Sequence, residues 1–135
     1  MFVVTSLHTQ SFEPLAEWTL YKNKKRYCEK HGYTLHYATD GGDEVSGLKM
    51  IAKNPPVPET HIPMGWGKIY LMKEAMNKYP DAEWIFNADC DTMITNMEIK
   101  LEDIVAQHTH SNTHILVPSD CSGINCGIMM VRNTP

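Results

Sequence analysis

The sequence predicts an α/β fold in which helices cover a mostly parallel central sheet. Two observations predict it. Short apolar runs rich in β-branched and aromatic residues alternate with stretches of helical periodicity along the chain, which is the pattern of parallel strands connected by helices. The chain has 135 residues, of which 42% are hydrophobic, enough to bury the core of one domain but not of two. We therefore expect residues 1–135 to form a single domain.

The composition excludes several classes of function. A net charge of −4 and an isoelectric point near 5.9 argue against general electrostatic binding to nucleic acid or to an anionic membrane. The apolar runs are far shorter than the roughly 20 residues that span a bilayer, and the first residues lack the basic and long apolar regions of a signal peptide. We therefore expect a cytoplasmic protein without a membrane segment, and self-association stays open.

The cysteines do not indicate a disulfide scaffold. They are Cys28, Cys90, Cys121 and Cys126, and without a CxxC pair they predict free thiols rather than a zinc site. A bridge between Cys121 and Cys126 stays open for a protein in an oxidising lumen.

The first predicted strand comprises residues 2–7, which are apolar and β-rich. A helix follows, with Pro14 near its first turn and Gly32 just after its end. Its apolar residues fall within an arc of about 140° at roughly 100° per residue, so we expect one buried stripe. The stripe comprises Phe12, Leu15, Ala16, Leu20 and Tyr27.

The second half of this helix is rich in cations. A nucleic-acid-binding patch is one interpretation, but solvated cations beside the negative end of the helix dipole are the interpretation that we favour. These cations are Lys22, Lys24, Lys25, Arg26 and Lys30.

The rest of the chain continues the alternation. Residues 33–38 predict a second strand, and residues 40–63, with four prolines and three glycines, predict a loop with one short element at 48–52. A helix over residues 65–79 ends before Pro80. Its apolar face, which we expect to be buried, comprises Trp66, Ile69, Met72 and Met76. The remaining predicted elements are strands at 83–88, 114–117 and 127–131 and a short helix at 101–107.

Two carboxylates follow the central predicted strand directly. Asp89 and Asp91 come just after residues 83–88, at the carboxyl end of the strand, where open α/β sheets bind ligands. Side chains at positions i and i+2 of extended backbone point the same way, so both carboxylates can bind one cation. Two oxygen ligands leave most of a Mg²⁺ or Mn²⁺ shell open for water and a diphosphate. The pair predicts a divalent cation that stabilises a leaving phosphate.

Five ordered segments resemble the blocks of one enzyme family. They are Tyr27-Cys28 with residues 31–35, Trp66-Gly67-Lys68, residues 79–85, residues 89–96, and residues 123–127 with 131–133. In this order they resemble glycosyltransferase family 34, the metal-dependent galactosyl-, mannosyl- and xylosyltransferases of GT-A fold. The resemblance implies a GT-A-like (Rossmann-like) three-layer sandwich. It also implies that the chain corresponds to the N-terminal nucleotide-sugar-binding part, truncated before the acceptor half.

The resemblance implies a specific reaction. A hexose or pentose is transferred with retention from a nucleotide-sugar, UDP-linked in preference to GDP-linked, to a glycan acceptor with Mn²⁺ or Mg²⁺. Asp89 and Asp91 match the metal-binding pair, and Lys68 matches a lysine that approaches the nucleotide or its phosphates. The other implied donor-site residues are Thr5 and Ser6 near the nucleoside, Asp40 near the base or ribose, and Asn125 beside the sugar. No catalytic residue is assigned.

Alternatives stay open because the chain departs from the family. Asn87 and Ala88 stand where the family usually has aromatic residues, and the family's acceptor half, with a histidine that completes the metal shell, lies beyond residue 133. A non-catalytic nucleotide-sugar-binding module is therefore one alternative. The other is a phosphotransferase of the haloacid dehalogenase type, with Asp89 as nucleophile, although Met93 stands where Thr or Val is usual. Relatives are usually anchored in the Golgi, so the Golgi lumen is the alternative location.

Overall fold

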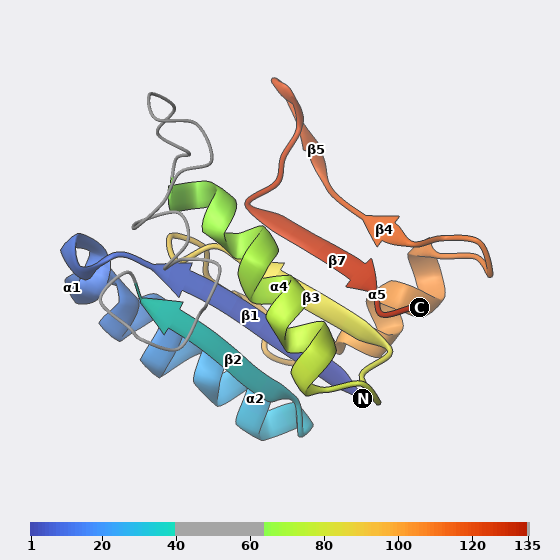
Figure 1. Cartoon of the computed structure of the whole chain (residues 1–135), viewed down its shortest axis with the longest axis horizontal. Coiled ribbons are helices and arrows are strands. Elements are labelled where there is room, and N and C mark those ends of the chain that lie inside the picture. Colours follow the sequence, from blue (N-terminus) through green and yellow to red (C-terminus); the bar gives the residue numbers. More distant parts are fainter. Residues whose placement is uncertain (40–63, 135) are drawn as a thin grey trace.

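A computed structural model describes residues 1–39 and 64–134, which form a central sheet between two layers of helices (Figure 1). Within these residues the sheet has the strand order β2-β1-β3-β7-β4. The strands are β1 (Phe2–His8), β2 (Thr34–Thr39), β3 (Trp84–Ala88), β4 (Ile115–Leu116) and β7 (Ile128–Arg132). β1 pairs in parallel with β2 and β3, whereas β7 is antiparallel to both β3 and β4. Four of these five strands therefore point the same way, which confirms the predicted α/β class.

The helices cover both faces of the sheet. On one face lies a continuous helical stretch made of η1 (Gln10–Phe12), α1 (Glu13–Ala16), the π-helical η2 (Glu17–Lys24) and α2 (Lys25–His31). Gly32 ends this stretch in the left-handed conformation at φ 72°, which glycine adopts at little cost. α5 (Leu101–His108) packs on the same face, and η3 (Met64–Trp66) with α4 (Gly67–Lys78) lies on the other (Figure 1).

Alternate side chains of the central strands point into two separate cores. Val4 and Phe86 pack with Tyr27 of α2 and Leu101 of α5. Their strand neighbours Val3 and Ile85 pack on the other face against α4. This period-two alternation places a buried layer on each side of β1 and β3, as expected for a three-layer sandwich.

The predicted stripe on the first helix is wrong at its start. Phe12 is 49% exposed and Leu15 37% exposed, whereas Ala16, Leu20 and Tyr27 are buried. The physical reason is that residues 17–24 are π-helical, so their wider turns do not follow 100° per residue. The side chains that this stretch does bury are Ala16, Thr19, Leu20, Asn23, Lys24, Tyr27 and Cys28.

The prediction of five solvated cations is wrong for one of them. Lys22, Lys25, Arg26 and Lys30 are exposed, in agreement with the prediction. Lys24 is fully buried, with a relative exposure of 0%, because backbone carbonyls of the chain after β3 surround its ammonium group.

The apolar face predicted for residues 65–79 is half wrong. Met72 is buried and Met76 is partly buried, but Trp66 is 61% exposed and Ile69 45% exposed. Instead of packing on the sheet, Trp66 and Ile69 line an open groove of about 320 Å³ together with Met129 at the start of β7.

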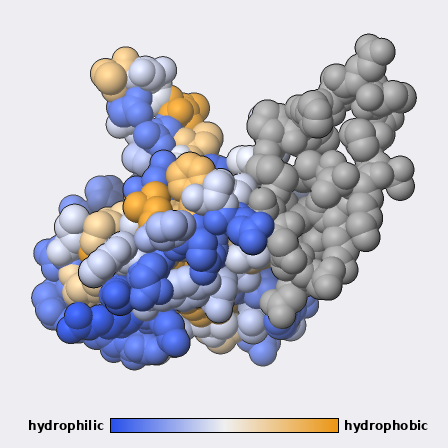
Figure 2. All heavy atoms as spheres, turned by 90° about the vertical axis from the view of Figure 1, so that its left-hand side faces the viewer, coloured by the Kyte–Doolittle hydropathy of each residue, from blue (hydrophilic) through white to orange (hydrophobic). Residues whose placement is uncertain are grey.

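A short hairpin beyond β4 is absent from the sequence prediction. β5 (Ser119–Asp120) pairs with β6 (Gly123–Ile124) to form an arm that projects from the sheet (Figure 1). Gly123 has a φ of 111°, which favours glycine. Figure 2 shows the molecule from the side of α1. The arm stands above this face, and the lower part of the face is mostly hydrophilic.

Three further expectations concern the cysteines, membrane-spanning helices and the segment that begins at Asp40. All four cysteines are free in the structure, with Cys121 and Cys126 exposed. No helix among residues 1–39 and 64–134 combines the length and apolarity needed to cross a bilayer. Asp40 and the short element predicted at 48–52 lie outside the described residues.

Candidate functional site

The candidate site is a pocket at the carboxyl ends of β1 and β3. Its volume is about 170 Å³, and it opens where two neighbouring parallel strands end, the usual place for a ligand in an α/β sheet. Asp89 and Asp91 reach it from the turn after β3, and Lys68 reaches it from the first turn of α4. The full lining comprises Leu7, His8, Thr9, Phe12, Gly65, Lys68, Asp89, Cys90 and Asp91.

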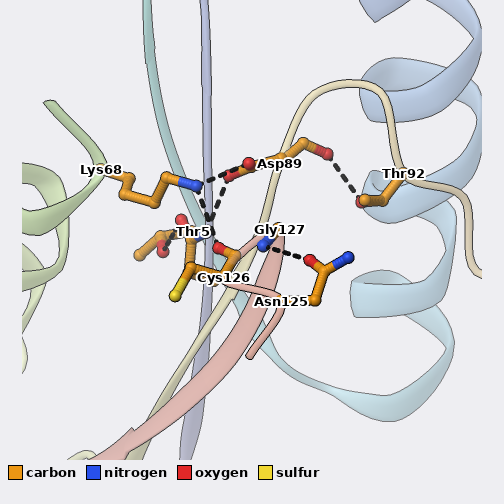
Figure 3. A network of polar contacts seen from close by, with 8 residues as sticks. Thr5, Lys68, Asp89, Thr92, Asn125, Cys126 and Gly127 are labelled. Carbon is orange, nitrogen blue, oxygen red and sulfur yellow. Dashed lines mark hydrogen bonds and ion pairs between the residues drawn. The ribbon is translucent and has the colours of Figure 1, made fainter. Parts of the chain in front are cut away.

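Asp89 is held by contacts from three elements. Lys68 Nζ lies 2.6 Å from Asp89 Oδ2 (Figure 3). Asn87 Nδ2 donates to Asp89 Oδ1 over 3.1 Å. Lys68 also donates to the carbonyl of Cys126 over 3.0 Å, and the Asp89 N–H donates to the carbonyl of Gly127 over 2.8 Å. The start of α4, the end of β3 and the chain before β7 therefore meet at Asp89.

A hydrogen-bonded chain runs beneath this carboxylate. Thr5 Oγ1 donates to Asn87 Oδ1 over 3.2 Å, and Asn87 in turn donates to Asp89. Thr5 and Asn87 are register partners in the β1–β3 ladder, and both side chains are fully buried. Ser6 is buried beside Thr5, and its hydroxyl has no hydrogen-bond partner within the described parts of the chain. Thr5 and Ser6 thus lie below the pocket, whose lining on β1 begins at Leu7.

Asn87 has a place at the site that the sequence did not predict. The signal that could have found it is an amide at the end of an otherwise apolar strand, two residues before Asp89 and on the same face. A buried amide needs partners for its donors and its acceptor. Asn87 finds them in Thr5 and Asp89, one on each side.

Asp91 and Asp89 are separated by a tight turn. The Thr92 N–H and Thr92 Oγ1 both donate to the Asp89 carbonyl, over 3.1 and 2.7 Å (Figure 3). Asp91 is exposed and Asp89 is half-buried, and both line the same pocket. The structure therefore brings Asp89, Asp91 and Lys68 to one pocket, although through a turn at Cys90 and Asp91 rather than through the extended backbone expected from the spacing.

The donor set of this pocket fits a hard divalent cation. Each carboxylate oxygen has two acceptor positions, and in Asp89 a single side-chain donor contacts each oxygen, so room remains for a metal. Among residues 1–39 and 64–134, no three His, Cys, Asp or Glu side chains gather at one point. Two carboxylates with open positions suit Mg²⁺ or Mn²⁺, which keep waters and take substrate phosphates as ligands.

Asn125 shapes the loop that approaches Asp89. Its Nδ2 donates to Asp120 Oδ2 over 2.8 Å, and its Oδ1 accepts from the Gly127 N–H over 2.8 Å. The hydrogen bond from Asn125, followed by that from the Ser122 N–H, lowers the pKa of Asp120 below its usual range. A Cβ on Gly127 would lie 3.0 Å from Asn125 Oδ1 and 3.8 Å from Asp89 Oδ2. The absence of a side chain at Gly127 therefore permits the close approach of this loop to Asp89.

One wall of the pocket contains two rings, those of Phe12 and His8. Phe12, expected in the buried stripe, is half-exposed and lines the pocket. His8 also lines it, with its Nε2 2.6 Å from Glu13 Oε2. His8 Nδ1 is buried and has no hydrogen-bond partner among the described residues.

Comparison with known proteins gives a family. The sequence matches the galactosyl transferase GMA12/MNN10 family over residues 1–118. It is 27% identical to an alpha-1,2-galactosyltransferase of Schizosaccharomyces pombe, over 90% of this chain and 37% of the relative. It is 22% identical to the probable alpha-1,6-mannosyltransferase MNN10 of Saccharomyces cerevisiae, over 87% of this chain and 34% of the relative. The chain thus spans little more than a third of the length of these relatives.

A plant relative and a solved structure agree with this result. The galactomannan galactosyltransferase 1 of Cyamopsis tetragonoloba is 25% identical over 84% of this chain and 23% of the relative. The fold is similar to that of a glycosyltransferase involved in the glycosylation of the major capsid of PBCV-1, with a TM-score of 0.65 and 18% identity. That match covers 96% of this chain and 60% of the other. It supports the GT-A-like architecture expected from the sequence.

Proposed function

Because the chain belongs to the galactosyl transferase GMA12/MNN10 family, glycosyltransferase family 34, we propose that it binds a nucleotide-sugar with a divalent cation and transfers the sugar to a glycan acceptor. The observation that supports this most strongly is the meeting of Asp89, Asp91 and Lys68 at one pocket at the carboxyl ends of β1 and β3. Two carboxylates suit a divalent cation that is bound to a diphosphate, and one ammonium suits the phosphate oxygens.

In this proposal Asp89 and Asp91 hold Mn²⁺ or Mg²⁺, which stabilises the negative charge that develops on the leaving nucleoside diphosphate. Lys68 contributes a compact positive charge at the same place. In the structure its ammonium is paired with Asp89 Oδ2 at 2.6 Å. When a diphosphate enters the pocket, Lys68 exchanges that carboxylate oxygen for a phosphate oxygen.

The nucleoside occupies the wall formed by the end of β1 and the residues that follow it. The half-exposed ring of Phe12 offers a stacking surface, and His8 and Leu7 complete this wall. Thr5 and Ser6 are buried beneath this wall and do not line the pocket. Asn125 acts on the sugar side through the loop that it holds next to Asp89. Asp40 stays a prediction for the base or ribose.

Several finer features of the reaction are proposals from the family resemblance. They are a UDP-linked donor in preference to a GDP-linked one, Mn²⁺ in preference to other cations, and retention at the sugar carbon. The Golgi lumen and the cytoplasm stay alternative locations. Family membership favours glycosyl transfer over phosphotransfer with Asp89 as nucleophile. The non-catalytic binding module stays an alternative, because the chain spans 37% of the length of its S. pombe relative.

Calorimetric titration tests the proposal. UDP and GDP are titrated into the protein with Mn²⁺ and again with EDTA, and into the variants Asp91→Asn and Asp81→Asn. Asp81 is an exposed carboxylate outside the pocket lining, so its substitution is the matched control. We expect one nucleotide to bind only with Mn²⁺, and binding to be lost in Asp91→Asn alone. A folded protein that binds neither nucleotide would contradict the proposal, and binding without sugar transfer would favour the non-catalytic module.

A further inference from the structure

A fully buried lysine lies directly behind the turn that contains Asp89 and Asp91. Lys24 Nζ donates to the carbonyls of Thr92, Thr19 and Cys90 over 2.6, 3.2 and 3.5 Å. Its relative exposure is 0%, and within the described residues it forms no ion pair with a carboxylate. Three carbonyls use the three N–H donors of one ammonium group, so this side chain connects η2 to both sides of the turn.

The residue before it makes a second connection. Asn23 Nδ2 donates to the Ile94 carbonyl over 2.9 Å, and the Ile94 N–H donates to Asn23 Oδ1 over 2.8 Å. One buried amide thereby satisfies both polar backbone groups of a single residue, as a neighbouring strand would. We call Asn23 and Lys24 together the helix clamp.

The contacts of the helix clamp alternate with the carboxylates. Along the chain after β3, the clamp binds backbone groups of Cys90, Thr92 and Ile94. Asp89 and Asp91 line the pocket. In the sequence Asp89 precedes Cys90, and Asp91 lies between Cys90 and Thr92. The clamp therefore holds every second residue on the helix side and leaves the two carboxylates to the pocket.

The π-helical geometry of η2 makes this arrangement possible. In an α-helix, Thr19 and Lys24 would be separated by about 140° around the axis. In η2 the hydrogen bonds connect residues five apart, as in the bond from the Lys25 N–H to the Leu20 carbonyl. Residues 19 and 24 thereby come to the same side, where Lys24 Nζ reaches the Thr19 carbonyl. π-Helical turns are rare and occur frequently at functional sites.

The charge of Lys24 also matters to the site. Desolvation lowers its pKa to about 8, and this effect is opposed by Cys90, Asp91 and Asp89. An isolated buried ammonium is strongly unfavourable. The two nearby carboxylates therefore stabilise the buried cation, and the cation reduces the repulsion between them.

We propose that Lys24 and Asn23 are positioning residues for the cation site: they fix the turn at 89–94 so that Asp89 and Asp91 converge before any ligand binds. The clamp touches neither metal nor nucleotide. Its effect on ligand binding rests on the proposed function, whereas its effect on the turn does not.

The test compares Lys24→Met with Lys25→Met. Methionine keeps the length of the side chain and removes its charge and donors, and Lys25 is the exposed neighbour on the same helix. Amide hydrogen exchange at 92 and 94 measures the turn, and electron paramagnetic resonance of Mn²⁺ with UDP measures the cation site. In Lys24→Met we expect exchange at least about tenfold faster and Mn²⁺–UDP binding about tenfold weaker, since charged hydrogen bonds of this kind are lost. Lys25→Met should match the wild type in both.

Asn23→Ala keeps the test decisive if Lys24→Met does not fold. It removes the acceptor of the Ile94 N–H, so exchange of that one amide should rise while the core amides of β1 and β3 stay protected. Wild-type exchange rates at 92 and 94 in a folded variant would overturn the inference, as would a loosened turn with unchanged Mn²⁺–UDP affinity. Wild-type protein that binds no nucleotide would contradict the proposed function instead, and the exchange rates would still decide whether the clamp holds the turn.

Discussion

Lys68 and Asp89, the first-turn cation of α4 and the residue that follows β3, form an ion pair with 2.6 Å between Nζ and Oδ2. Their side chains are only 15% and 31% exposed, so the pair is shielded from solvent more than an ordinary surface ion pair. Lys68 also donates to the Cys126 carbonyl, which ties the pair to the chain before β7. The pair therefore joins the start of α4 to the turn after β3 and to the chain before β7.

Lys68→Ala should weaken Mn²⁺–UDP binding by about tenfold to a hundredfold, because a phosphate loses a charge-assisted partner in a partly buried site. Calorimetric titration measures the change. Lys73→Ala, at an exposed position of the same helix, is the control and should bind as the wild type does. Equal affinities in Lys68→Ala and the wild type would remove Lys68 from the donor site.

The two hydrogen bonds that connect Thr5, Asn87 and Asp89 should contribute to stability as one coupled network. Thr5→Val should reduce the free energy of unfolding by about 1 kcal/mol, and Asn87→Leu by about 1–3 kcal/mol, since each leaves a buried partner unsatisfied. Urea denaturation of both variants and of the double variant measures the coupling. Because both substitutions break the same 3.2 Å hydrogen bond, their effects should be less than additive. Strict additivity would show that the two side chains act independently.

Gly127→Ala should destabilise the loop by about 1 kcal/mol, the usual cost of a small overpacked contact. The new Cβ would lie 3.0 Å from Asn125 Oδ1. Because the φ of Gly127 is not positive, the substitution adds no backbone strain, and this contact accounts for the expected loss of stability. Thermal unfolding measures the effect, and Gly65→Ala, whose Cβ meets no described atom within 4 Å, is the control. In an Asn125→Ala background the same substitution should have almost no effect, and a persistent loss there would point to a cause other than the contact.

Cys28 should make the stability fall at alkaline pH. Burial raises the pKa of its thiol from 9.0 to about 12, so the unfolded state loses its proton first. The contribution is complete below about pH 9 and is lost as the pH rises toward 12, by up to about 1.4 kcal/mol for each pH unit. The difference in unfolding free energy between wild type and Cys28→Ala, measured at pH 8 and at pH 11, isolates this group. A difference that does not depend on pH would contradict the raised pKa.

Most of the fold could be predicted from the sequence, because its elements have strong local signals. The apolar runs that became β1 and β3, Pro14 and Gly32 around the first helix, and the carboxylates after β3 all fall where expected. The hairpin of β5 and β6 was not predicted, since Ser119–Asp120 and Gly123–Ile124 contain no apolar run and are too short to show a period.

What escaped prediction depends on contacts between distant segments. Lys24 looks like a solvated helix cation until the carbonyls of Cys90 and Thr92, more than 60 residues away, surround it. Helical periodicity cannot indicate a π-helical segment, so the burial of Asn23 and Lys24 and the exposure of Phe12 were both missed. Asp89 and Asp91 could be singled out from the sequence because their spacing is local, and both line the pocket.

The most direct measurement is a crystal structure with Mn²⁺ and UDP, recorded with anomalous scattering from manganese. We predict one manganese peak within coordination distance of both Asp89 and Asp91, with the Lys68 ammonium moved from Asp89 to a phosphate oxygen. The base should lie against the wall that contains Phe12. Manganese bound elsewhere, or UDP seated in the pocket without a metal between its phosphates and the two carboxylates, would contradict the account.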